Sequence, residues 1–346
     1  MIRFLRLALL PFSALYSVGV FLRNRLYDLN IVKSKQGALP TIVVGNLSVG
    51  GTGKTPHIEF LVNALKENVA LAVLSRGYGR KTEGFQLSDE HSTSTQIGDE
   101  PHQIKKKFPT LTLAVCEDRL SGIELLKRKT DAKLVLMDDA FQHRKLRGDI
   151  NILLMDFYSP WWNDFTLPAG MLRDNVMEKR RADIIIVTKC PGKIDSRTIA
   201  QFEKSISPSQ HQSIYFTRLK YGKPIQIAGE SMDATAIKEV VAFSGIARPE
   251  HFERQLTQFY ELKKFVQFRD HHIFSQLDIK NLVQECGNFA SRGIALLTTE
   301  KDAVKLMEMT LYIRIPLFYI PIEIEFVSKA DSFLMELREK LNVRKL

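Results

Sequence analysis

Residues 41–56 read Thr-Ile-Val-Val-Gly-Asn-Leu-Ser-Val-Gly-Gly-Thr-Gly-Lys-Thr-Pro, a β-branched run that breaks into a glycine-rich turn. Residues 57–66 then have the pattern of an amphipathic helix. A strand, a glycine-rich turn and a helix in this order predict a loop whose backbone N–H groups close on phosphates. The strict form of the motif has Gly where this chain has Ser48. The predicted phosphate-binding residues are Ser48, Val49, Gly50, Gly51, Thr52, Gly53, Lys54 and Thr55.

Two side chains of this loop have specific chemistry. Lys54 places a positive charge beside the β- and γ-phosphates, and the Thr55 hydroxyl is a ligand for Mg²⁺. A tight strand–helix turn without a ligand is the alternative interpretation of the same residues.

The composition indicates a folded protein of a reducing compartment. With 346 residues, 45% of them hydrophobic, the chain can bury a large core and favours two domains over one. Cys116, Cys190 and Cys286 lie far apart, which argues against a disulfide framework and against a zinc site.

The net charge of +10 is concentrated at the N-terminus, where six basic residues face Asp28 alone between residues 1 and 35, a net +5. The uncharged residues 7–22 would span about 24 Å as a helix, short of the roughly 30 Å hydrocarbon core, and Pro11 is expected to interrupt them. We therefore expect a helix in the interface of an anionic membrane. A signal peptide and an ordinary buried first helix are the alternatives. No motif of a nucleic-acid binder is visible.

Apolar runs alternate with helical patterns, which predicts parallel β/α units: a P-loop NTPase-like α/β sheet with helices on both faces. We expect this P-loop domain over residues 36–212, after the membrane-associating residues 1–35. Residues 213–228 are expected to form a hairpin-like linker, and residues 229–346 a smaller α/β domain. The expected strands of the first domain are 41–44, 69–74, 111–115, 134–137, 150–155 and 184–187.

Two adjacent acids, Asp138 and Asp139, follow the apolar run 134–137. A carboxylate at a strand end beside a P-loop typically organises Mg²⁺, and the second acid would orient a neighbour. The sequence leaves open which of the two acids organises Mg²⁺ and which orients the neighbour. Gln142 and His143 come next, and His143 either meets substrate or phosphate or is structural.

Four further stretches contain candidate functional groups. The acids of residues 97–101 either begin a helix or supply a carboxylate that accepts a hydroxyl proton. Residues 75–80 and 167–174 are loops with arginines that could neutralise phosphate. Residues 268–274 carry two histidines, for which support of proton transfer is favoured over metal binding. Residues 298–302 form either a helix cap or a contact across the interdomain cleft.

Taken together, these motifs resemble the tetraacyldisaccharide 4′-kinases of lipid A synthesis, in order and over nearly the whole chain. The resemblance also explains why this chain has Ser48 where the strict motif has Gly. The small departures from the family pattern are Ala140, Met171 and Asp174. The motifs are residues 44–56, Ser75-Arg-Gly-Tyr78, Gly98-Asp-Glu-Pro101, Asp138-Asp-Ala-Phe-Gln-His-Arg144, Leu167-Pro-Ala-Gly170 with Leu172-Arg173, Asp270-His-His272 and Thr299-Glu-Lys-Asp302.

The resemblance implies transfer of the γ-phosphate of ATP, with Mg²⁺, to the 4′-hydroxyl of a tetraacyldisaccharide 1-phosphate, giving lipid IVA. The place would be the cytosolic face of the inner membrane, with the lipid and the membrane surface as partners and no protein partner implied. By the same likeness Asp99 is the base and His271 its partner, with Lys54, Asp139 and Arg173 also catalytic. The implied metal ligands are Thr55 and Asp138, and the implied substrate-binding residues are Arg76, Tyr78, Gln142 and His143.

Two rival functions remain. A membrane-associated P-loop switch ATPase or GTPase would usually carry a lysine where this chain has Val49. The guanine-reading motif of such a GTPase, Asn-Lys-x-Asp, is also absent, and Val187-Thr-Lys-Cys190 is only weakly similar to it. A soluble small-molecule kinase would not need residues 1–35.

Overall fold

The larger sheet is mainly parallel and has the P-loop strand at its centre. The computed structural model describes residues 6, 8–287, 294–307, 309 and 313–343. The strand order is β16-β10-β9-β8-β2-β6-β3-β5-β4, in which β4 and β16 are antiparallel edges. The strands are β2 (Thr41–Asn46), β3 (Leu71–Ser75), β4 (Gln86–Leu87), β5 (Thr112–Val115), β6 (Leu134–Asp138), β8 (Ile150–Asp156), β9 (Ile184–Thr188), β10 (Ser213–Tyr221) and β16 (Ile322–Phe326).

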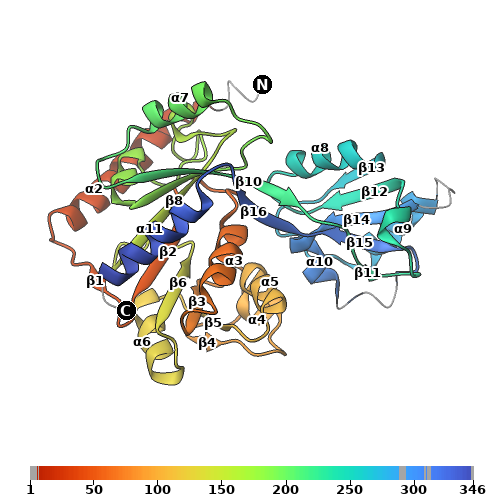
Figure 1. Ribbon diagram of the computed structural model, residues 1–346, viewed down its shortest axis with the longest axis horizontal. Coiled ribbons are helices and arrows are strands. Elements are labelled where there is room, and N and C mark those ends of the chain that lie inside the picture. The colour runs from red at the N-terminus through yellow and green to blue at the C-terminus, as the bar shows by residue number, and fades with distance from the viewer. Residues whose placement is uncertain (1–5, 7, 288–293, 308, 310–312, 344–346) are drawn as a thin grey trace.

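Helices cover both faces of this sheet, as the sequence predicts (Figure 1). Successive residues of β2 are buried on opposite faces: Val43 packs in one core, and Ile42 and Val44 pack in the other. Strands covered on both sides lose the polar alternation of an exposed sheet, which is why they read as continuous apolar runs. The helices of this part are α3 (Lys54–Leu65), α4 (Ser94–Ile97), α5 (Asp99–Lys107), α6 (Arg119–Lys129), α7 (Ser196–Ile206) and α11 (Ala330–Val343), with the 3₁₀ turns η1 (Trp161–Asn163) and η2 (Val176–Arg181).

A smaller sheet lies beside the larger one, and β10 and β16 extend toward it (Figure 1). Its order is β11-β15-β14-β12-β13, parallel except for β11. Its elements are β11 (Ile225–Ala228), β12 (Glu239–Ser244), β13 (Glu261–Gln267), β14 (Ile294–Thr299), β15 (Leu317–Ile320), α8 (Glu250–Phe259), α9 (Gln276–Gly287), α10 (Glu300–Leu306) and η3 (Ala234–Ala236). A small third pair joins β1 (Lys35–Gln36) to β7 (Leu146–Arg147).

Two expected boundaries are wrong. Residues 213–228 do not form a hairpin, because β10 pairs with β9 and β16 whereas β11 pairs with β15 of the smaller sheet. Residues 229–346 are not one small domain, because the chain returns to the larger sheet through β16. Helix α11 then buries Phe333, Leu337 and Leu341 in the core beside β2. Alternating apolar residues indicate a strand, but they do not say which strand it will pair with.

Helix α2 (Leu10–Asp28) has Ser13 and Asn24 toward the protein, whereas Arg23, Arg25 and most of its apolar residues are exposed. Pro11 lies in its first turn, where a missing N–H costs no hydrogen bond, so the expectation that it interrupts the helix is wrong. Ser13 and Asn24 are buried, whereas Leu15 is 72% exposed. An ordinary buried first helix is therefore excluded. No helix in the described part of the chain combines the length and apolar character needed to cross a bilayer.

Candidate active site

The P-loop connects β2 to α3 in a conformation that glycine permits. Gly50 and Gly53 have φ values of +102° and +89°, a region that other residues rarely occupy. Gly53 precedes α3 and supplies no side-chain cap, so the first N–H groups of the helix are available to an anion. A hydrogen bond fixes the loop to the end of β2, because the Asn46 side-chain amide donates to the Thr52 hydroxyl over 2.8 Å.

A cleft of about 750 Å³ opens above this loop, between the ends of the two sheets. Sheet register explains part of the convergence, because Val44 of β2 lies opposite Asp138 of β6. Residues of the smaller sheet, including Arg248 and Lys301, complete the wall. The predicted residues that line the cleft are Ser48, Val49, Gly50, Gly51, Thr52, Gly53, Lys54, Thr55, Arg76, Tyr78, Asp138, Asp139, Gln142, His143, Arg173 and His271.

The two adjacent acids lie in different environments. Asp138 is completely buried, and its Oδ2 accepts a hydrogen bond from the Ser75 hydroxyl over 3.2 Å. Its Oδ1 has no hydrogen-bond partner among the described residues. Burial, together with the charges of Glu100 and Asp139, raises the pKa of Asp138 to about 7. Because Oδ1 has no hydrogen-bond partner among the described residues, it is the oxygen of Asp138 that is available for a cation.

Asp139 instead forms ion pairs. Its carboxylate lies 3.7 Å from the Lys54 ammonium and accepts two hydrogen bonds from the Arg173 guanidinium. Burial opposes ionisation, but the charges of Lys54 and Arg173 outweigh it and lower the pKa of Asp139. Arg173 also donates to Asn46 Oδ1, so the loop that contains Arg173 is fixed against both the P-loop strand and the acid.

Asp99 and His271 meet across the junction of the two sheets. Asp99 begins α5, His271 follows β13, and Asp99 Oδ2 lies 3.1 Å from His271 Nδ1. Lys301 Nζ lies 3.3 Å from His271 Nε2. An ammonium can only donate, so Nε2 accepts and Nδ1–H is donated to Asp99. Asp99 itself is not among the cleft-lining residues, whereas His271 and the neighbouring Glu100 are.

A lysine that the sequence analysis missed, Lys305, also contacts this pair. Burial alone would raise the pKa of Asp99, but the hydrogen bond from His271 and the charge of Lys305 lower it. Lys305 Nζ lies 3.2 Å from Asp99 Oδ2. For residues 298–302 both interpretations apply: Thr299 caps α10, and Lys301 Nζ lies 3.5 Å from Glu100 Oε1 of α5, which belongs to the other part of the chain. No local signal pointed to Lys305.

A second missed group holds the opposite side of the P-loop. Lys189, at the end of β9, donates to the Gly51 carbonyl and lies 2.9 Å from Asp156 Oδ2. Arg248 of the smaller sheet lies 3.4 Å from the same carboxylate oxygen. The faint resemblance of residues 187–190 to a nucleotide-reading motif was the one available signal for Lys189. Arg248 and Asp156 had none.

Gln142 and His143 lie beside the P-loop strand. The Gln142 side-chain amide donates to the Asn46 carbonyl over 2.7 Å. Burial and the charge of Arg119 lower the pKa of His143 to about 4, so this imidazole is neutral at pH 7. His143 can therefore offer a hydrogen bond to substrate or phosphate but no positive charge. Arg76 and Tyr78 are exposed at the cleft rim.

Comparison with known proteins gives one consistent answer. A sequence model described as tetraacyldisaccharide-1-P 4′-kinase matches residues 5–342. The tetraacyldisaccharide 4′-kinase of Parabacteroides distasonis is 39% identical over 344 residues, covering 95% of this chain and 92% of that one. The enzyme of the same name from Flavobacterium johnsoniae is 40% identical, with 95% of each chain covered. A crystal structure of LpxK from Aquifex aeolicus in complex with ATP superposes with a TM-score of 0.76 at 30% identity, covering 97% of this chain and 99% of that one.

Proposed function

The chain belongs to the tetraacyldisaccharide-1-P 4′-kinase family, and from this premise we propose how its cleft performs the reaction. The protein is an ATP-dependent kinase that phosphorylates the 4′-hydroxyl of a tetraacyldisaccharide 1-phosphate, giving lipid IVA in lipid A synthesis. A switch ATPase is not favoured. The observation that supports the residue assignments is that the open N-terminus of α3 and the Asp99–His271 pair lie in or beside one cleft.

The P-loop holds the phosphates of ATP. Loop N–H groups, among them those of Gly51, Gly53 and Lys54, and the Lys54 ammonium surround the β- and γ-phosphates, where the α3 dipole favours negative charge. The N–H groups of Val49 and Thr52 already donate to backbone carbonyls. Arg173 neutralises charge that develops on the transferred group, because its guanidinium already lies against the same cluster as Lys54. Asp139 holds both cations in place between turnovers.

Thr55 and Asp138 are the residues that would hold Mg²⁺. The fit rests on Asp138 Oδ1, a buried carboxylate oxygen without a hydrogen-bond partner among the described residues, and on the hard oxygen ligands that Mg²⁺ prefers. When bound, the ion would neutralise the β- and γ-phosphate oxygens. The described residues contain no cluster of three or more His, Cys, Asp or Glu side chains suited to a metal. Such a site relies on phosphate and water oxygens for its remaining ligands.

The Asp99–His271 pair removes the proton of the acceptor hydroxyl. Asp99 is the proposed base and His271 its partner: His271 lines the cleft, and its Nδ1–H is donated to Asp99. The hydroxyl oxygen forms a bond to the γ-phosphorus, the bond from that phosphorus to the β–γ bridging oxygen breaks, and ADP leaves with the electron pair. Arg76, Tyr78, Gln142 and His143 are proposed to contact the acceptor sugar.

The outward apolar face of α2 places the enzyme on the membrane that contains its lipid substrate. Its exposed residues include Phe12, Leu15, Leu22 and Leu26. Buried Ser13 and Asn24 face the opposite way, so the apolar face can enter the headgroup region while the cleft stays in water. We assign residues 1–35 to the cytoplasmic face of the inner membrane. The larger sheet then binds the nucleotide, and the smaller sheet contributes His271.

The direct test is transfer of labelled γ-phosphate from ATP, with Mg²⁺ and detergent, to a tetraacyldisaccharide 1-phosphate. Label on the lipid that disappears in a Lys54→Ala variant supports the kinase. Label released only as inorganic phosphate supports the switch ATPase instead. In the same assay Asp99→Ala should reduce turnover far more than it reduces ATP binding, and near-normal turnover would remove Asp99 from catalysis.

A further inference from the structure

The polar residues of α2 form one stripe that faces the rest of the protein. Four of them are spaced four, seven and four residues apart, which keeps them on one side of a helix with 3.6 residues per turn. Each makes a contact outside the helix: Ser13 and Ser17 with Thr166, Asn24 with Asp174, and Asp28 with Arg144 and Arg180. The helix therefore binds the chain through side-chain polar groups, and in particular through residues 166–180.

Helix α2 contacts Arg173 and its neighbour Asp174 directly. Tyr16 OH donates to the Arg173 carbonyl over 2.9 Å. Asn24 Nδ2 donates to Asp174 Oδ1 over 2.8 Å, and both side chains are almost completely buried. On the cleft side, Arg173 Nη1 lies 3.1 Å from Asp139 Oδ2. One peptide unit thus separates the α2 contact from the active-site contact.

Asp174 faces away from the cleft. It is absent from the residues that line the cleft, and its second oxygen has no hydrogen-bond partner among the described residues, with the Arg181 guanidinium 3.9 Å away. A buried carboxylate is costly unless hydrogen bonds satisfy it. The amide of Asn24 is one of two groups that donate to Oδ1, the other being the Asn175 backbone N–H. Loss of the Asn24 amide should therefore move this loop.

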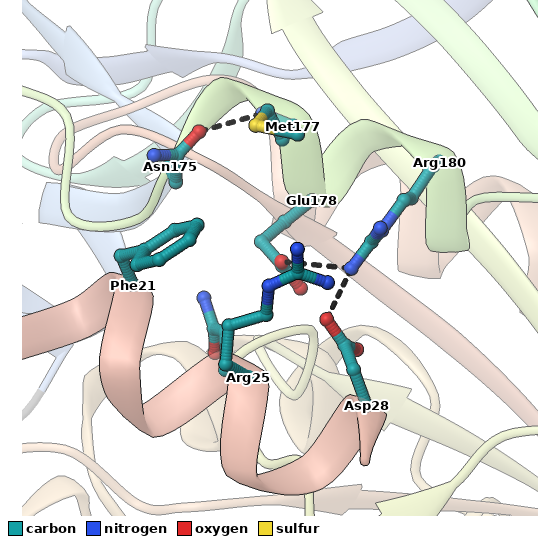
Figure 2. Close-up of a pocket in the computed structure, with 8 residues that line it drawn as sticks. Phe21, Arg25, Asp28, Asn175, Met177, Glu178 and Arg180 are labelled. Carbon is teal, nitrogen blue, oxygen red and sulfur yellow. Dashed lines mark hydrogen bonds and ion pairs between the residues drawn. The ribbon is translucent and has the colours of Figure 1, made fainter.

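The same junction continues along η2. Figure 2 shows Asp28 of α2 facing Arg180 and Glu178, with Phe21 and Arg25 on the adjoining turns of the helix. Arg144 connects the two sides, because it pairs with both Asp28 and Glu178. This end of α2 is anchored independently of Asn24, so a change at Asn24 should not release the helix.

We propose that Asn24 is a positioning residue for phosphoryl transfer. Through Asp174 it fixes the backbone on which Arg173 projects toward Asp139, so the helix that lies on the membrane also sets the geometry of the active site. The inference rests on the proposed role of Arg173. Displacing a charge-neutralising group by about 1 Å can reduce turnover roughly a hundredfold.

The test uses the full-length protein and three variants. Asn24→Asp places a second carboxylate against that of Asp174. The repulsion should move the loop and lower kcat about ten- to a hundredfold, with KM for ATP unchanged. The reciprocal exchange Asn24→Asp with Asp174→Asn removes the repulsion between the two carboxylates and should recover much of the lost kcat. Asn281→Asp makes the same chemical change at an exposed position of α9 and should leave kcat unchanged. Activity is measured in detergent micelles, beside thermal melting and binding to vesicles of anionic phospholipid.

Three results would overturn the inference. One is normal kcat in Asn24→Asp, and another is a failure of the reciprocal exchange to restore kcat when both variants melt like the wild type. The third is loss of vesicle binding together with kcat, because the effect would then come from membrane attachment. The proposed function fails differently: the wild type would not label the lipid, or Arg173→Lys would retain full kcat.

Discussion

Replacing Glu59 by Gln should make the stability of the protein less dependent on pH. Glu59 lies on α3, and its carboxylate shares one ammonium with Glu300 of α10: Lys107 Nζ lies 2.7 Å from Glu59 Oε2 and 2.9 Å from Glu300 Oε1. The three side chains connect the P-loop helix to the helix that carries Lys301 and Lys305. Burial and the charge of Glu300 raise the pKa of Glu59 from 4.5 to about 7 despite Lys107.

The direction in which stability changes with pH follows from how tightly Glu59 binds its proton in the folded and unfolded states. The folded state holds this proton more tightly than the unfolded state, so the stability that it contributes is complete below pH 4.5 and is lost as the pH rises to about 7. At about 1.4 kcal/mol per pKa unit, the shift from 4.5 to about 7 corresponds to about 3 kcal/mol. Glutamine does not titrate. The difference in unfolding free energy between Glu59→Gln and the wild type should therefore change by about 2 to 3 kcal/mol between about pH 5 and pH 8, in favour of the variant.

Urea unfolding at the two pH values measures this difference, since comparing the variant with the wild type cancels the titrating groups that do not interact with Glu59. Glu67→Gln removes an exposed carboxylate just beyond the end of α3 and serves as the matched control, with a much smaller change expected. If the wild type and Glu59→Gln show the same pH dependence, Glu59 is ionised in the folded protein at neutral pH and the reasoning is refuted.

Three further results are expected. Lys107→Met leaves two buried carboxylates without their cation and should cost about 3 to 5 kcal/mol in urea unfolding at neutral pH; a smaller loss than in Glu59→Gln would contradict the shared ion pair. Lys189→Met removes the donor to the Gly51 carbonyl and should weaken ATP binding about tenfold, or about 1.4 kcal/mol, as measured by calorimetry. Unchanged affinity would mean that the P-loop keeps its conformation without Lys189. Asp99→Asn should lower kcat about a hundredfold or more in the labelled-lipid assay with ATP affinity retained, and a kcat near that of the wild type would exclude the pair from proton transfer.

The strands, the P-loop and most of the candidate site were predictable from sequence, because each depends on neighbouring residues. A β-branched run, glycines at positions of positive φ and an uncapped helix start are local properties of residues 41–56. Because parallel strands end at one edge of a sheet, the acid at the end of β6 lies beside the P-loop that follows β2, and the cleft contains Lys54 and Asp138 together.

The tertiary structure decided which distant segments are partners. The alternating pattern of residues 213–228 predicted strands but not that β10 and β11 would enter different sheets, and the pattern of α11 did not reveal its return to the first core. The apolar arc of α2 was visible, but whether it faces a core or solvent depends on what the polar stripe contacts, namely residues 166–180. Lys305 reaches Asp99 from the other sheet, more than two hundred positions along the chain. Such contacts depend on how the whole chain packs, and no local window of sequence contains both partners.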